Sequence, residues 1–134
     1  AEFAEDGTVK SVGTQNFGNI RLYADNFVLA SGSFFSKGMI ATPDRIYEPV
    51  FGVDLSYAEG RDQWFDRNFW NKQNYISYGA KVSKFLHASI DGKPVGNLYA
   101  IGSLIGGSNT LYEGCGGGIA LLTALAAADG ILEK

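Results

Sequence analysis

The glycine-rich stretch before the last helical segment constrains this chain more than any other feature. Residues 112–132, YEGCGGGIALLTALAAADGIL, place four glycines and one cysteine directly before a run of strong helix formers. The run predicts a helix from about Gly116 to Leu132, apolar nearly all the way round and therefore buried on most sides. Three explanations of the glycines stay open: a reactive cysteine, a phosphate-binding loop, or close packing of a helix on a sheet.

Length and composition narrow the classes of function. With 134 residues, 46% hydrophobic and 19% charged, the chain has the composition of one globular domain. Eleven basic against fourteen acidic residues give a net charge of -3 without a basic block, so no nucleic-acid partner is expected. The start, AEFAEDG, lacks a Met and a basic signal region. We therefore expect residues 1–134 to be a single fragment of a longer protein, which the resemblance described below makes a C-terminal fragment.

The order of apolar and turn segments indicates an α/β fold. TVKSVGT and IRLYA, joined by the turn QNFGN, predict a β-meander, and NFVLAS predicts a short strand buried on both faces in a parallel sheet. Residues 36–80 are rich in aromatic residues without clear periodicity, which predicts an irregular insertion with one short helix around residues 57–64. Asp91-Gly92 is a turn signal, and NLYAIGS predicts a second buried strand.

Two strands end in turns that contain glycine, in VLASGS and LYAIGS. In α/β folds ligands bind at the carboxyl ends of strands, where glycine lets a cofactor approach the main chain. Gly32 or Gly102 alone is more simply an ordinary strand exit. Together with the glycine-rich helix start, the two turns favour a cofactor site.

The single cysteine and the single histidine give little evidence for a catalytic or metal site. Cys115 gains acidity at a helix N-terminus but has no neighbouring base, so a small structural side chain is the better interpretation. His87, the sole histidine, has no nearby ligand cluster, which argues against a metal site and for a surface or edge-strand position.

The irregular insertion contains arginines that could bind a substrate and aromatic residues that could form an interface. Arg45, Arg61 and Arg67 are more often solvated surface side chains, although one of them could bind a phosphorylated substrate. The aromatic residues are expected to form a local hydrophobic cluster or, if exposed, to mark a subunit interface; they are Trp64, Phe65, Phe69 and Trp70.

Three phrases together resemble a known family. They are ADNFVLASGSFFSKGMIA, IYEPVFGVDL and NLYAIGSLIGGSNTLYEGCGGGIALLTALAAA. Over roughly residues 17–132 the chain resembles the C-terminal part of the B-subunit family of anaerobic glycerol-3-phosphate dehydrogenases. These belong to the wider fumarate reductase/succinate dehydrogenase-like flavoproteins. The superfamily's first dinucleotide-binding βαβ unit is missing from these residues, so a partial FAD/NAD(P)-binding-type fold is expected.

The resemblance implies a function in anaerobic respiration. The whole enzyme would oxidise glycerol 3-phosphate to dihydroxyacetone phosphate and pass electrons toward the quinone pool. It would contain a flavin (FMN or FAD), a flavoprotein A subunit and an iron–sulfur C subunit. It would lie peripherally on the cytoplasmic face of the cell membrane. By itself the fragment is expected to be inactive and to self-associate through apolar surface that the missing unit would cover.

The resemblance also implies site residues. Glycine and serine backbone at the two turns and the helix start would contact the cofactor, at Ser31, Gly32, Gly102, Ser103, Gly106, Gly107, Gly116, Gly117 and Gly118. Glu113 and Arg45 are weaker candidates for substrate contact, the catalytic residues stay unassigned, and no metal is implied. The arginine and histidine pattern of fumarate reductases is absent from GGSNTLYEGCGGG. Two alternatives remain: a non-catalytic region for assembly or electron relay, and a related flavoprotein with another substrate.

Overall fold

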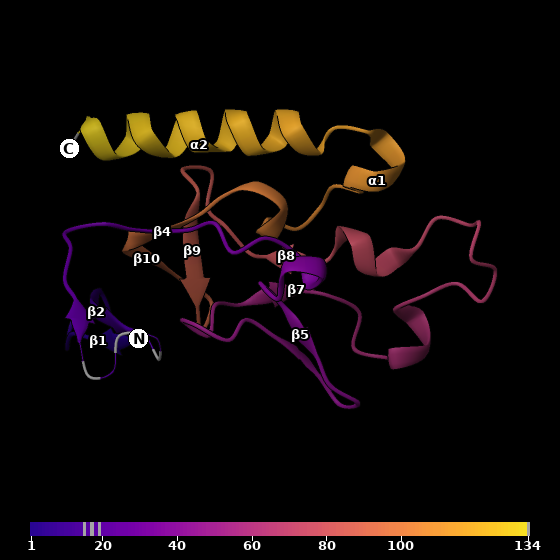
Figure 1. Ribbon diagram of the computed structural model, residues 1–134, viewed down its shortest axis with the longest axis horizontal. Coiled ribbons are helices and arrows are strands. Elements are labelled where there is room, and N and C mark those ends of the chain that lie inside the picture. Colours follow the sequence, from indigo (N-terminus) through magenta and orange to yellow (C-terminus); the bar gives the residue numbers. More distant parts are fainter. Residues whose placement is uncertain (15, 17, 19, 134) are drawn as a thin grey trace.

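Strand β10 lies at the centre of the fold. The computed structural model describes residues 1–14, 16, 18 and 20–133. β10 (Lys93–Ala100) pairs in parallel with β4 (Phe27–Leu29) and antiparallel with β9 (His87–Ile90), as Figure 1 shows. Its last three residues are fully buried, which confirms the predicted strand in NLYAIGS.

The turn between β9 and β10 lies at the predicted Asp91-Gly92. Both residues have positive φ, 51° and 75°, as a tight hairpin turn requires. Their backbone N–H groups donate to the Asp54 carboxylate at 3.2 and 2.7 Å. The carboxylate therefore attaches the turn to the chain that precedes β7 (Leu55–Ser56).

β4 confirms the predicted parallel pairing but not the predicted burial. Leu29 is 6% exposed, whereas Val28 is 47% exposed. The two side chains point to opposite faces of the sheet, because alternate residues of a strand do so. The expectation that this strand is buried on both faces is therefore wrong for this chain.

The N-terminal meander forms as predicted around short strands. β1 (Glu2–Phe3), β2 (Val9–Gly13) and β3 (Arg21–Leu22) pair antiparallel in that order. The predicted turn QNFGN includes residues 15, 17 and 19, which lie outside the described residues. The Asn97 amide of β10 exchanges two 2.9 Å hydrogen bonds with the backbone of Val9, which joins the meander to the central sheet.

Residues 36–80 contain short strand pairs and single 3-10 turns. The strand pairs are β5 (Ile40–Ala41) with β6 (Ile46–Tyr47), and β7 (Leu55–Ser56) with β8 (Gly79–Ala80). The turns are η2 (Phe34–Ser36), η3 (Arg61–Gln63) and η4 (Asn74–Ser77). The predicted helix around residues 57–64 is wrong beyond the three residues of η3. The indole of Trp64 donates to the Ala58 carbonyl at 2.7 Å and turns the chain inward there.

The predicted aromatic cluster is also wrong. Trp64 is 8% exposed, but Phe65, Phe69 and Trp70 are 52%, 79% and 88% exposed. Only Phe69 and Trp70 contact each other, edge to face at 5.4 Å between ring centroids. Their loop projects from the body of the molecule (Figure 1), and this corresponds to the alternative of an exposed, interface-like surface.

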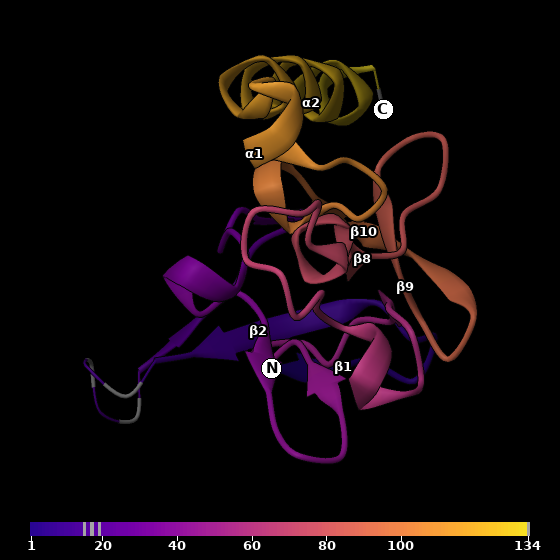
Figure 2. The same cartoon turned by 90° about the vertical axis from the view of Figure 1, so that its right-hand side faces the viewer.

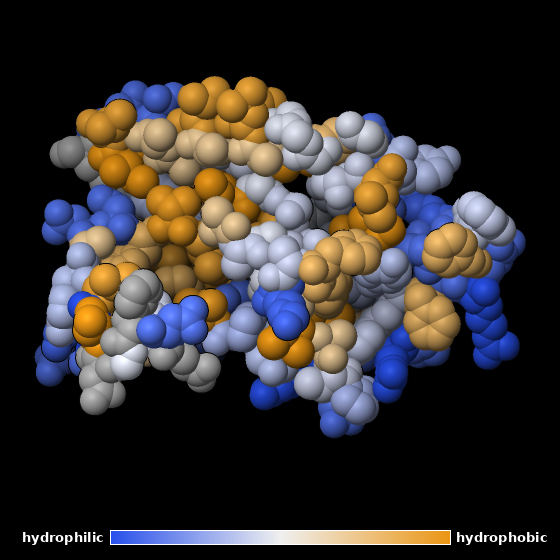
Figure 3. Space-filling model, in the orientation of Figure 1, coloured by the Kyte–Doolittle hydropathy of each residue, from blue (hydrophilic) through white to orange (hydrophobic). Residues whose placement is uncertain are grey.

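Helix α2 (Gly116–Leu132) has the predicted bounds and follows the short α1 (Thr110–Glu113). It lies above the central sheet on the side opposite the β1–β2 meander (Figures 1 and 2). The prediction that it is buried on most sides is wrong, because only Ala127 is buried. Leucines cover its outer face, visible as an orange band in Figure 3, with 54–83% exposure at Leu121, Leu122, Leu125 and Leu132.

Within the described part of the chain, no helix combines the length and the apolar character needed to cross a membrane.

Candidate functional site

The two glycine turns lie side by side because β4 and β10 are parallel neighbours. Leu29 pairs with Ala100 in the register, and the N–H of Ile101 donates to the Leu29 carbonyl at 3.1 Å. Both chains then leave the sheet at the same edge. A Cβ atom on Gly32 would lie 3.5 Å from the Ser103 hydroxyl, so the two turns are in contact. The structure thus brings together two of the predicted site segments.

The turn after β4 requires glycine at two positions. Gly32 has a φ of +78°, and a Cβ there would overlap the Ser36 hydroxyl. A Cβ on Gly38 would overlap the Gly32 carbonyl and lie 2.8 Å from the Ser31 oxygen. Ser36 donates to the Ser31 carbonyl at 2.9 Å and holds the turn closed.

Ser31 carries an unused polar atom at this turn. Its Oγ is buried and has no hydrogen-bond partner among the described residues. Buried hydroxyl groups are normally satisfied, so this one is available to a partner outside the described residues, either another part of the protein or a ligand. This observation fits the predicted contact with a cofactor.

The turn after β10 is bonded to helix α2. Gly102 has a φ of +68°, and its N–H donates to the Thr123 hydroxyl at 2.9 Å. Thr123 in turn donates to the Ile119 carbonyl at 2.6 Å. A Cβ on Gly102 would lie 4.0 Å from Ala120, so the helix rests directly on this turn. The first half of α2 is thereby positioned beside the turn after β10, which itself contacts the turn after β4.

The first turn of α2 is open. Helix N-termini have N–H groups without intrahelical acceptors, and the helix dipole adds positive charge there. A Cβ on Gly117 or Gly118 would meet nothing within 4 Å. The chain's own packing does not require glycine at these two positions. A group outside the described residues that approaches this backbone would require it.

Gly106 and Gly107 have different surroundings. A Cβ on Gly106 would lie 3.1 Å from the backbone of Gly79, and its N–H donates to the Ala80 carbonyl at 3.3 Å. Packing against Gly79 therefore explains Gly106 without a cofactor. Gly107, with a φ of +100°, donates to the Ser77 carbonyl at 2.8 Å and has open space where its Cβ would be. A cofactor contact at either position stays a prediction.

Glu113 and Arg45, the two weaker substrate candidates, are not brought together. Glu113 ends α1 beside α2, whereas Arg45 lies in the β5–β6 hairpin on the opposite side of the molecule (Figure 1). Arg45 instead lies over the Tyr47 ring at 5.1 Å.

Cys115 does not have the acidity that a helix N-terminus would give it. Desolvation raises the pKa of its thiol, and the nearby Glu113 carboxylate, 3.6 Å from the sulfur, raises it further. The expectation of a more acidic thiol is wrong, because desolvation and a like-charged neighbour outweigh the dipole. A thiol that keeps its proton is a poor nucleophile, so this side chain fits the structural interpretation.

His87 occupies the predicted edge-strand position, on β9. Its ring packs against Tyr99 with centroids 4.4 Å apart. Among the described residues, no group of three or more histidine, cysteine, aspartate or glutamate side chains is arranged to hold a metal ion.

Several residues that shape the site were not predicted from the sequence. Ser36 and Gly38 form the turn after β4, and Thr123 attaches α2 to the turn after β10. The signal available for Thr123 is a lone hydroxyl in an apolar helix. The neighbouring sequence SKG does not indicate that Gly38 contacts Gly32, six residues earlier.

Known proteins similar to this chain are flavoproteins and dehydrogenase subunits. A family model described as "FAD binding domain" matches residues 1–119. A Pectobacterium carotovorum protein, named as the B subunit of anaerobic glycerol-3-phosphate dehydrogenase, is 46% identical over 87% of this chain and 28% of its own length. Proteins of the same name from Haemophilus influenzae and Vibrio vulnificus are 46% and 39% identical over 97% and 94% of this chain.

The chain spans less than a third of the length of these relatives, 28–31% in the three proteins compared. No solved structure matches it significantly.

Proposed function

The chain belongs to the FAD binding domain family, and from that membership we propose that it forms part of the flavin site of a glycerol-3-phosphate dehydrogenase subunit. The name of the similar proteins supports the substrate. One structural observation carries the proposal: glycines 117 and 118, which the chain's own packing does not require, lie in the first turn of a helix that is bonded to the turn after β10.

The residues present fit a flavin nucleotide. Ser31, beside Gly32, offers an unpartnered hydroxyl, suited to the polar adenosine or phosphate part. The N–H groups of Gly116, Gly117 and Gly118 suit a carbonyl oxygen that gains negative charge on reduction. We propose FAD rather than FMN, because the family model is that of an FAD binding domain.

The bound flavin would accept the two electrons that glycerol 3-phosphate loses, with two protons, on becoming dihydroxyacetone phosphate. The role of this chain is electrostatic. The N-terminal end of α2 stabilises negative charge on the reduced cofactor, and Thr123 holds that end against the turn at Gly102. The raised pKa of the Cys115 thiol disfavours the thiolate, so we assign this side chain no part in the transfer.

Partners and location follow from the same resemblance. The similar proteins are named as subunits, which supports a complex, and for it we propose a flavoprotein A subunit and an iron–sulfur C subunit. We propose peripheral association of that complex with the cytoplasmic face of the cell membrane and delivery of electrons to quinone. The exposed leucines of α2 support self-association of this chain when it is expressed alone, which sedimentation would test.

A second candidate function is assembly or electron relay, with substrate oxidation in a partner subunit. The exposed pair Phe69 and Trp70 favours it, because large exposed aromatic side chains are enriched at protein interfaces. This function keeps the flavin but removes direct reduction by glycerol 3-phosphate.

Spectral titration of the full-length protein tests the proposal. Adding FAD and FMN separately should give a saturable flavin complex with preference for FAD, and absence of any complex would refute the flavin site. Glycerol 3-phosphate should then bleach the bound flavin without the partner subunits. Bleaching that requires them would favour the relay function instead.

A further inference from the structure

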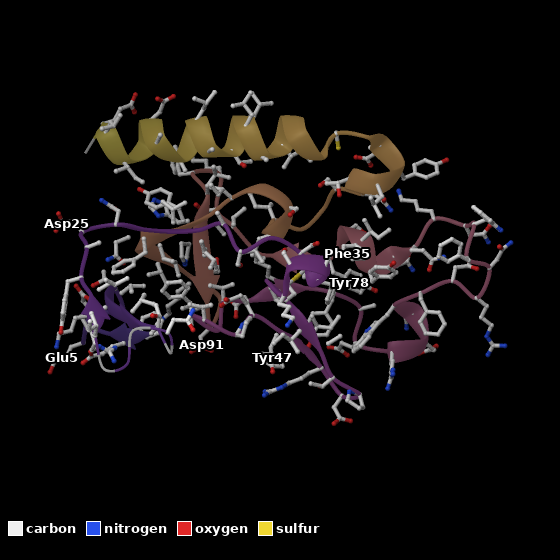
Figure 4. The ribbon with its side chains drawn as sticks, viewed as in Figure 1. Glu5, Asp25, Phe35, Tyr47, Tyr78 and Asp91 are labelled. Atoms are coloured by element: carbon white, nitrogen blue, oxygen red, sulfur yellow. The ribbon has the colours of Figure 1, made fainter. Side chains whose placement is uncertain are left out.

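A hollow lies beside the β5–β6 hairpin, and Phe34, which closely follows Gly32, is part of its lining. It has a volume of about 380 Å³, a size typical of small-molecule sites. We call it the hairpin pocket and define it by its lining: Phe34, Ala41, Thr42, Pro43, Ile46, Arg61, Trp64, Phe65 and Tyr75. Figure 4 shows the side chains of this part of the molecule, with Tyr47 of β6 and Tyr78 at the end of η4 labelled.

Aromatic and aliphatic side chains form most of the pocket wall. Trp64 is buried and contacts Tyr57 edge to face, while Phe34 contacts Tyr75 in the same manner. Such contacts fix the ring orientations, so the wall is a rigid apolar surface. A flat apolar group would find complementary faces here.

Two of the polar groups in the lining are already used within the chain. The Trp64 N–H donates to the Ala58 carbonyl at 2.7 Å. The Thr42 hydroxyl donates to the Arg45 carbonyl at 3.0 Å and accepts from the Arg45 N–H at 3.2 Å. Neither is therefore free to bind a polar ligand strongly.

The charge in the lining is positive. Arg61 is its single charged member, since the lining contains no carboxylate. Within the described residues, ion pairs occur only between Glu2 and its neighbours Lys10 and Arg21, so the Arg61 guanidinium has no carboxylate within 4 Å. An unpaired guanidinium beside an aromatic wall is suited to an anion attached to a ring.

We propose that the hairpin pocket binds a small organic anion with a flat apolar body. The anionic group lies on the guanidinium of Arg61, and the ring lies against Trp64 and Tyr75. The lining contains none of the predicted cofactor residues, so the pocket is distinct from the proposed flavin contacts.

Calorimetric titration of the full-length protein with phenyl phosphate tests the proposal. Inorganic phosphate and methyl phosphate serve as probes with similar charge but without a ring, and neither is the substrate proposed for the flavin site. Phenyl phosphate should bind at least about tenfold more tightly than either, because only it buries an apolar ring. Equal or tighter binding of a ringless probe would overturn the proposed ligand class.

Matched arginine variants test the contact. Arg61→Gln should weaken phenyl phosphate binding about tenfold or more, the scale of a lost charge-assisted hydrogen bond. Arg61→Lys should recover part of the loss. Arg61 and Arg67 are both exposed, but only Arg61 belongs to the lining, so Arg67→Gln should leave binding unchanged. Equal affinities of Arg61→Gln and the unaltered protein would overturn the proposal.

Flavin absorbance recorded on the same samples shows that each variant is folded. It also separates the two proposals. A protein that binds flavin but not phenyl phosphate overturns the hairpin-pocket ligand alone, and one that binds phenyl phosphate but not flavin overturns the proposed function alone.

Discussion

The strand-end turns and the first turn of α2 are both rich in glycine, but for different reasons. In the turn after β4, substituting Gly32 or Gly38 would bring a side chain into atoms of the same chain. In the first turn of α2, a Cβ on Gly117 or Gly118 would meet nothing within 4 Å. The first set is explained by folding, and the second is not.

This difference separates structural from functional glycines. Glycine inside a helix costs roughly 0.5–1 kcal/mol relative to alanine, so two open glycines lower stability without a packing benefit. A benefit must then come from outside the chain's own packing. Substitution at the two regions should therefore change stability in opposite directions.

The largest effect is expected at the turn after β4. Gly38→Ala should lower the free energy of unfolding by about 3 kcal/mol or more, because both overlapping atoms belong to the backbone and cannot move cheaply. Gly52→Ala, at a φ of +71° in open space, is the matched control and should cost roughly 1 kcal/mol through backbone strain alone. Equal losses in urea unfolding would show that the close approach at Gly38 is not tight.

A smaller effect is expected where the two regions are joined. Thr123→Val keeps the side-chain shape but leaves the Gly102 N–H without its acceptor, which should cost about 1–2 kcal/mol. Thr123→Ser keeps the hydroxyl and should retain most of the stability. If the valine variant unfolds at the same urea concentration as the serine variant, the bond does not hold α2 to the turn.

Substitution of Cys115 should change enzyme activity only weakly. Cys115→Ser should leave turnover of the full enzyme within a few-fold, and a loss beyond about a thousandfold would establish a catalytic thiol.

Because desolvation and Glu113 raise the pKa of the Cys115 thiol, its alkylation by iodoacetamide at about pH 8 should be slower than that of free cysteine. Glu113→Gln lowers that pKa and should speed alkylation; an unchanged rate would contradict the role of the carboxylate.

Local patterns were sufficient to predict several elements. The bounds of α2, the Asp91-Gly92 turn and the buried end of β10 all follow from propensity and periodicity in neighbouring residues. The two strand-end turns could be placed together, because parallel strands end at one edge of a sheet.

Other features depend on residues far apart in the sequence. Leu121 and Leu125 are exposed because no other described segment covers that face of α2, and the sequence of the helix alone does not predict this. Gly38 matters because the chain returns to Gly32, and the hairpin pocket collects Phe34, Arg61 and Tyr75 from segments without periodicity. Packing of this kind is a property of the fold and not of a local pattern.

The smallest change in stability gives the most direct test of the flavin site. Gly118→Ala and Gly130→Ala both add a methyl group to α2, and neither Cβ meets an atom closer than 3.9 Å. Each should stabilise the helix by roughly 0.5–1 kcal/mol. Gly118 lies in the first turn of the helix, at the proposed flavin site, whereas Gly130 lies near its far end beside Tyr99.

Flavin affinity of the two variants is the decisive measurement, made by spectral titration of the full-length protein with FAD. Gly118→Ala should weaken FAD binding about tenfold, since a methyl group would occupy the approach to the backbone, while Gly130→Ala should bind FAD as the unaltered protein does. If Gly118→Ala is stabilised and binds FAD with unchanged affinity, the flavin does not approach the first turn of α2.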